Sequence, residues 1–371
     1  MGKKLEIAAI VAAATIGEGV FALPYVIDHS GWLISIAWFV AIAAVVTVAH
    51  IIYLRTLAEV REKSRLLGLA RKYFGETGFW IGFAAIVIGL LLGFVAYLVL
   101  GSHFLGILLP GISPLAALLL FWFMLACLIW GSEGKIAGLE VAGIALITVA
   151  IFFIFFTGRP ALALANMAPV VPGNFFLPFG AVLFALAGWT SVEQIYEIIR
   201  KKKSATVVTP GMFWVFLAGT SFAGVLYWLF ALGVIGSVPY VAADTVSGIA
   251  LWPAWKQSAL AVIGIAALCV VSLPIARELR GAIEKDLKWN QFASRAAIIL
   301  IPLATVLAGL TNFLTIVSIA GGIFLVVQYL LIISVGRRAL ALVPREKALL
   351  DVLAILFICA AIYQIAIFVV H

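Results

Sequence analysis

The chain has 371 residues, of which 65% are hydrophobic and 11% are charged, and its net charge is +8 at pH 7. Soluble domains contain about 25% charged residues, so this composition excludes a soluble enzyme, a disulfide-rich secreted scaffold, a disordered chain and a DNA-binding module. Apolar runs of about 20 residues recur along the chain, and each is long enough to cross a bilayer as a helix. The sequence therefore predicts an all-α polytopic membrane protein that forms one domain, 1–371.

Eleven membrane spans are expected, with two charged or polar connectors, 55–76 after the second span and 237–257 after the seventh. The predicted spans are, in chain order, 5–27, 32–54, 78–109, 114–130, 136–157, 175–199, 211–236, 258–280, 292–309, 312–335 and 349–370.

The basic residues predict the orientation. With the N-terminus in the cytoplasm, all of the 24 lysines and arginines except Arg159 and Lys256 fall on the cytoplasmic side. This positive-inside asymmetry predicts a multi-pass protein of the cell membrane, and the odd number of spans places His371 outside. It also explains the net charge, so the expected partners are the lipid bilayer and a small-molecule substrate, and no nucleic acid. A monomer is compatible with these features.

The spans divide into two halves of similar length, 5–157 and 175–335, followed by an additional helix, 349–370. Because each half has five spans, the two halves have opposite orientations, which is the pattern of an inverted-repeat secondary transporter. The first span of each half should be broken near the middle of the membrane. Gly17, Glu18 and Gly19 precede Pro24 in span 1, and Gly188 follows a run of small residues in span 6.

These segments resemble a known family. Gly17-Glu18-Gly19-Val20-Phe21-Ala22-Leu23-Pro24-Tyr25 is similar to the GxGxxxLP motif of the amino acid/auxin permease family, which includes bacterial aromatic amino-acid permeases. Phe184 to Tyr196 resembles the sixth span of that group, and 55–76 resembles its first inner loop. The resemblance implies a LeuT-like 5+5 inverted-repeat fold of the amino acid–polyamine–organocation superfamily and an amino-acid substrate held at the two breaks.

The resemblance and the apolar lining give a set of expected substrate-binding residues. They are Thr15, Ile16, Gly17, Gly19, Phe21, Tyr97, Phe184, Ala185, Ala187, Gly188 and Trp189. The apolar members favour a neutral, apolar or aromatic L-amino acid. Glu18 departs from the small or neutral residue that many relatives have at this place, and a cationic substrate is the better interpretation if its carboxylate faces the substrate side chain.

Intramembrane carboxylates favour proton coupling, because a carboxylate in an apolar cavity can bind and release a proton near neutral pH. The candidates are Glu18 and Glu193. A sodium site would use backbone carbonyls of Ala13 and Ile16 with the hydroxyl of Ser272, whose neighbours Val271 and Leu273 lack hydroxyls. We therefore expect a proton-coupled symporter with no cofactor and no bound metal.

Two alternatives stay open, a sodium-coupled amino-acid symporter and an amino-acid-sensing receptor on the same fold, like the membrane subunits of spore-germinant receptors. An enzyme is not expected, because neither HExxH nor GxSxG occurs in the sequence. His50 and His103 are interpreted as interfacial histidines near the ends of spans 2 and 3.

Overall fold

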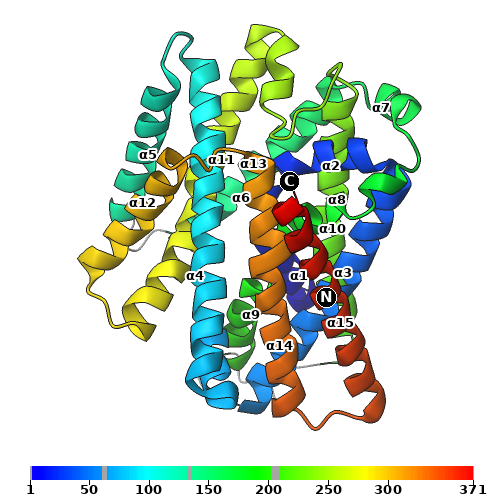
Figure 1. Ribbon diagram of the computed structural model, residues 1–371, viewed down its shortest axis with the longest axis vertical. Helices are drawn as coiled ribbons and strands as arrows, with labels where there is room; N and C mark the ends of the chain where they lie inside the picture. The colour runs from blue at the N-terminus through cyan, green and yellow to red at the C-terminus, as the bar shows by residue number, and fades with distance from the viewer. Residues whose placement is uncertain (1, 61–64, 132–135, 202–208, 210, 371) are drawn as a thin grey trace.

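The computed structural model describes residues 2–60, 65–131, 136–201, 209 and 211–370. The part of the chain so described is almost entirely helical and has no strand (Figure 1). Its helices are α1 (Gly2–Thr15), η1 (Glu18–Ala22), α2 (Leu23–Ser30), α3 (Trp32–Val60), α4 (Leu66–Leu108), α5 (Pro114–Gly131), α6 (Ile136–Thr157), α7 (Pro160–Asn166), η2 (Pro172–Asn174), α8 (Leu177–Leu186), α9 (Thr190–Lys201), α10 (Met212–Ile235), η3 (Ser247–Leu251), α11 (Ala254–Arg280), η4 (Gly281–Asp286), α12 (Gln291–Leu307), α13 (Phe313–Ile319), η5 (Ala320–Leu325), α14 (Val326–Ala339) and α15 (Pro344–Val370).

Each predicted span coincides with one helix or with helices in series. Seven helices in the described ranges are long and apolar enough to cross a membrane, and counting each of two bent pairs as one span raises this number to nine. The first predicted span consists of α1, η1 and α2, and the sixth consists of α8 and α9. The all-α membrane fold is thus confirmed, whereas the inverted relation of the two halves stays a prediction.

The described parts of the connector after the second span are almost entirely helical, and the part from Leu66 onward continues into the third span. Gly75 adopts φ 67° inside α4, a left-handed conformation that glycine takes without steric cost. The chain turns there between a short connector helix and the long span that follows it, at the lower end of the molecule in Figure 1. The third span therefore starts just after Gly75.

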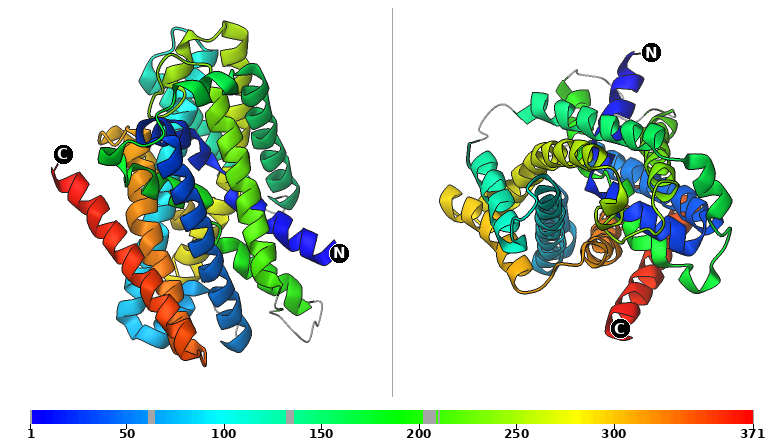
Figure 2. Two further views of the ribbon diagram at one scale, coloured as in Figure 1. Left: turned by 90° about the vertical axis from the view of Figure 1, so that its right-hand side faces the viewer. Right: turned by 90° about the horizontal axis from the view of Figure 1, so that it is seen from above.

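The core of the bundle lies around two long helices. α4 packs against α5, α11, α12, α13 and α14, and α10 packs against α1, α3 and α6. α15 packs against α14 and η5 and lies at the edge of the bundle (Figure 2). Its outward side chains, such as Val352 and Ile355, are more than half exposed. In a membrane, this apolar face would contact lipid.

The two ends of the molecule differ in charge. We call the end at which α3 and α14 finish and α4 begins the basic end, because Arg55, Arg65, Arg337 and Arg338 lie there. The opposite end carries the connector between α10 and α11.

Candidate functional site

Two helix breaks face each other in the middle of the bundle. α1 ends at Thr15, Gly17 is extended with φ −157° and ψ −165°, and the chain then bends by 58° into η1 and α2. α8 ends at Leu186, and Ala187 is extended with φ −68° and ψ 125° before α9 begins. Two glycines and a run of small residues explain why the helices end there, because such residues hold a helix weakly.

The two breaks approach so closely that side chains would not fit between them. A Cβ on Gly19 would lie 2.8 Å from Cα of Ala185, and a Cβ on Gly188 would lie 2.8 Å from the hydroxyl oxygen of Thr15. The structure thus brings together the expected site residues of span 1 and span 6. The side chain of Glu18 lies outside the described part of the structure.

A tyrosine of α10 joins the two breaks. The hydroxyl of Tyr227 donates to the carbonyl of Thr15 at 2.6 Å, has the carbonyl of Ala185 as a second acceptor at 3.2 Å, and accepts from the amide of Gly17 at 3.0 Å. Breaks leave backbone groups without helical partners at membrane depth, where each must find another. The sequence analysis missed Tyr227, and the available signal was a single tyrosine inside the apolar seventh span.

Open space lies beside the breaks and beside α4. A Cβ on Gly17 would meet no atom within 4 Å, and the same holds for Gly93, a buried glycine of α4. Tyr97 follows Gly93 by one helical turn, is fully buried, and packs edge-on against Phe94 with ring centroids 5.7 Å apart. An added methyl group would therefore meet no neighbouring atom at either glycine.

An aromatic cluster covers the breaks on the side of the opposite end. The ring of Phe21 packs edge-on against Phe104 at 5.6 Å and against Phe230 at 5.4 Å. The hydroxyl of Thr245, in the connector between α10 and α11, donates to the carbonyl of Phe21 at 2.6 Å. The connector is thereby fastened to the segment that follows the span-1 break.

The same connector is fastened to α4 by a contact between His103 and Asp244. Nδ1 of His103 lies 2.9 Å from a carboxylate oxygen of Asp244, and the amide and hydroxyl of Ser247 donate to that carboxylate at 2.9 and 2.8 Å. Burial raises the pKa of Asp244, but the hydrogen bonds from His103 and Ser247 outweigh burial and hold this pKa below its usual value.

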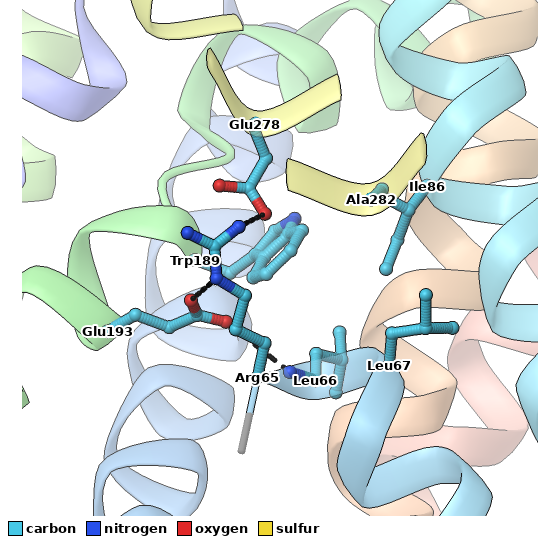
Figure 3. A pocket seen from close by; sticks show the side chains of 8 residues that line it. All are labelled: Arg65, Leu66, Leu67, Ile86, Trp189, Glu193, Glu278 and Ala282. Atoms are coloured by element: carbon cyan, nitrogen blue, oxygen red, sulfur yellow. Dashed lines mark hydrogen bonds and ion pairs between the residues drawn. The ribbon is translucent and has the colours of Figure 1, made fainter. Parts of the chain in front are cut away.

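A second polar cluster lies at the basic end, below the span-6 break (Figure 3). Tyr53 donates to Glu193 at 2.6 Å, and the guanidinium of Arg65 lies 3.8 Å from Glu193 and 3.1 Å from Glu278. A cavity of about 10 Å³, enough for about one water molecule, lies within the cluster. It is lined by Arg65, Leu66, Leu67, Ile86, Trp189, Glu193, Glu278 and Ala282.

Trp189 faces this cluster and α14. Its ring nitrogen donates to the side-chain oxygen of Gln328 at 2.7 Å, and Gln328 in turn donates to the carbonyl of Ala85 at 3.0 Å. The indole thus links α9 to α14 and α4, next to the break.

The remaining expected residues are distributed around the breaks. Phe184 is half-buried and lies near Gly19, and Ile16 is buried at the end of α1. Ala13 is half-buried on α1, whereas the hydroxyl of Ser272 donates at 2.7 Å to the carbonyl of Cys269 within its own helix. Within the described residues, no group of three His, Cys, Asp or Glu side chains is placed to hold a metal ion.

The interfacial interpretation is wrong for His50. Its side chain is fully buried between helices, and its Nε2 atom lies 3.1 Å from the hydroxyl of Tyr329. His103 is partly exposed, but it pairs with Asp244 as described above.

The fold resembles those of solved transporters. MhsT in complex with L-phenylalanine aligns with a TM-score of 0.66 and 14% sequence identity over 98% of each chain. A manganese transporter of Eremococcus coleocola, in complex with an aromatic bis-isothiourea substituted compound, aligns with a TM-score of 0.64 and 15% identity over 98% of this chain and 87% of that one. These likenesses show that the chain has the LeuT-like fold of these proteins.

The family is shown by the sequence. Residues 2–252 match the model of the tryptophan/tyrosine permease family, and the chain belongs to this family. No curated protein sequence matches the chain. The expected relation to aromatic amino-acid permeases is confirmed, the protein is a transporter and not an enzyme, and the wider superfamily assignment stays a prediction.

Proposed function

We propose that this protein carries an aromatic L-amino acid, such as tryptophan or tyrosine, across the cell membrane by alternating access. The observation that carries the proposal is the pair of facing helix breaks joined by Tyr227, in a chain of the tryptophan/tyrosine permease family. Unwound backbone at membrane depth is tolerated where it lines a cavity, and in transporters it marks the substrate site.

We place the proposed substrate beside Gly17 and Gly93, where an added Cβ would meet no atom within 4 Å. Its carboxylate and amino groups would contact the backbone amides and carbonyls at the breaks, because broken helices offer both. Its ring would lie among Phe21, Tyr97 and Phe184, which supply an apolar, aromatic lining.

The proposed transport route is covered at both ends of the molecule. Phe21 and the connector held by Thr245 cover the breaks on one side, and the Arg65 cluster lies across the other. In alternating access, α1–α2, α3, α8–α9 and α10 would move as a group against α4 and α11, opening one end at a time.

We propose the proton as the coupling ion, with Glu18 and Glu193 as its candidate carriers. Glu193 is partly buried and accepts hydrogen bonds from Tyr53 and from the amide of Leu66. Ser272 is the single hydroxyl in its part of α11, and it donates within that helix. Sodium prefers several oxygen ligands, so a carboxylate that binds a proton is the better-supported coupling site.

Uptake of labelled L-tryptophan into proteoliposomes tests the proposal. An inward proton gradient or an inward sodium gradient would be imposed at the same membrane potential. Accumulation with the proton gradient alone is expected. Accumulation that requires sodium would identify sodium as the coupling ion, with Ala13, Ile16 and Ser272 as its candidate site. Binding without flux would indicate a receptor instead of a permease.

The variant Glu18→Gln tests whether Glu18 carries the coupling proton. If Glu18 carries the proton, uphill uptake should be lost while exchange of labelled for unlabelled substrate continues, because exchange needs no net proton movement. Glu193→Gln is the matched comparison, since it keeps the hydrogen-bond acceptor for Tyr53 and removes only the ionisable group. Uphill uptake at the wild-type level in both variants would contradict carboxylate-based coupling.

A further inference from the structure

Three fully buried polar atoms lie without a hydrogen-bond partner in the described structure between α3 and α10. They are the hydroxyl oxygens of Thr47 and Thr220 and the Nδ1 atom of His50. Buried polar atoms are nearly always hydrogen-bonded, and those without a protein partner often bind an ordered water molecule.

The packing of the two helices places these atoms close together. Thr47 and His50 are three residues apart on α3 and therefore share one face of that helix. The ring of His50 contacts Phe216 of α10 with centroids 6.0 Å apart, and Thr220 follows Phe216 by one turn. A second contact further along the two antiparallel helices, between Phe39 and Trp228, brings Thr47 and Thr220 to the same level.

A hydrogen bond joins His50 to α14, close to the span-6 break. The hydroxyl oxygen of Tyr329 lies 3.1 Å from Nε2 of His50, and the backbone amide of Gly188 lies near the same hydroxyl. Because Nε2 has this partner, Nδ1 is the ring atom that needs another one. Nδ1 donates a hydrogen bond in one tautomer of the neutral ring and accepts one in the other.

The chemistry of the three groups selects the ligand. A ring nitrogen and two hydroxyls need a partner that both donates and accepts hydrogen bonds, which a water molecule does in either tautomer of His50. We propose that Thr47, His50 and Thr220 bind one buried water molecule, which is connected through His50 and Tyr329 to the backbone of Gly188 at the span-6 break.

A double-mutant cycle on the purified full-length protein tests whether Thr47 and Thr220 bind the same water molecule. Thr47→Val and Thr220→Val keep the shape of the side chain and remove the hydroxyl. Each should lower the unfolding midpoint by about 2–5 °C, and the double variant should lose less than the sum, because the first substitution already releases the water. If the site is dry, both substitutions remove an unsatisfied hydroxyl, so unchanged or higher midpoints with additive effects would overturn the proposal.

Thr56→Val is the matched control. Thr56 is also fully buried on α3, but its hydroxyl donates to the carbonyl of Ile52 at 2.8 Å. Its replacement should have a smaller effect and should not couple to Thr220→Val. An experimental structure that resolves other buried waters should show density within hydrogen-bonding distance of Nδ1 of His50, and empty density there would also overturn the proposal.

The connection to the break has its own test, which rests on the proposed function. Thr220→Val should weaken the binding of L-tryptophan several-fold, and the same substitution made together with Tyr329→Phe should add nothing, because the chain to Gly188 is already cut. Equal effects of Thr220→Val in both backgrounds would overturn the connection. If the wild-type protein binds no aromatic amino acid, the proposed function fails, and the thermal cycle still decides on the water.

Discussion

A single phenol substitutes for the hydrogen bonds that two broken helices lose. The hydroxyl of Tyr227 satisfies the carbonyl of Thr15 and the amide of Gly17 and lies within reach of the carbonyl of Ala185. Thr15 belongs to α1, Ala185 to α8 and Tyr227 to α10, so one hydroxyl holds these three helices together. A hydroxyl with one donor and two acceptor sites fits this place, and no apolar residue would.

Replacing this hydroxyl should separate the breaks. Tyr227→Phe keeps the buried ring and leaves the amide of Gly17 and the carbonyl of Thr15 unsatisfied, at a cost of about 1–3 kcal/mol. We expect a lower unfolding midpoint and about tenfold weaker binding of L-tryptophan, measured by thermal unfolding and by equilibrium binding. Tyr240→Phe, which removes a hydroxyl from an exposed tyrosine, is the control. Wild-type binding by Tyr227→Phe would contradict the bridging role.

Two glycines of the span-1 break should respond differently to the same added methyl group. In Gly19→Ala the Cβ would lie 2.8 Å from Cα of Ala185, so the backbone must shift and the unfolding midpoint should fall by several degrees. In Gly17→Ala the methyl meets open space, so the midpoint should change little while L-tryptophan binding weakens. Equal thermal effects of the two variants would show that the breaks do not pack as described.

At the scale of elements, the length of the apolar runs and the helix-breaking residues were sufficient to predict the spans. The breaks at Gly17 and after Ala187 follow from glycines and small residues in otherwise apolar runs. The sequence did not reveal the partners that join different elements, such as Tyr227 with Thr15, or Asp244 with His103. Those pairs depend on how helices distant in sequence pack, and a single sequence carries no signal of that packing. For the same reason His50 was placed at an interface and lies in the core.

The cluster at the basic end should hold α9 against α11 and the start of α4. Arg65 lies between Glu193 and Glu278, so Arg65→Gln leaves two partly buried carboxylates facing each other with less compensation. We expect amide hydrogen exchange to become several-fold faster around Leu66 and Glu193. Arg71→Gln, which breaks the exposed pair with Glu76, is the control and should leave these amides unchanged. Unchanged exchange in Arg65→Gln would mean that apolar packing alone closes this end.

The connector at the opposite end should be stabilised in a pH-dependent way. Because the pKa of Asp244 is lowered in the folded protein, its carboxylate contributes stability above the usual value of 3.8, and this contribution is lost as the pH falls through the lowered value. Asp244→Asn should reduce stability by about 2 kcal/mol at pH 7. The difference from wild type should shrink below pH 3.8, as measured by thermal unfolding. A difference that is the same at pH 7 and pH 3 would contradict the stabilisation of this carboxylate by His103 and Ser247.

At the scale of the whole molecule, apolar and basic side chains occupy different parts of the surface. Exposed apolar side chains cover the flanks of the bundle, as on α15, and the arginines gather at one end. The apolar flanks can contact lipid only if the bundle stands across the bilayer. Because basic residues are favoured beside the cytoplasmic leaflet, we expect the basic end to face the cytoplasm. The physical rules that predicted the orientation from sequence thus act on the folded molecule as well.

This division predicts which positions a membrane-impermeant thiol reagent reaches in intact cells. In a background in which Cys127, Cys269 and Cys359 are replaced by alanine, Tyr240→Cys at the opposite end should be labelled from outside. Arg345→Cys, exposed at the basic end in the first turn of α15, should be labelled only after the membrane is permeabilised. The two positions act as controls for each other, because both are exposed in the folded protein. The reverse pattern would invert the orientation and place the Arg65 cluster at the outer entrance of the transport route, where a proton arriving from outside would meet Glu193 before the substrate site.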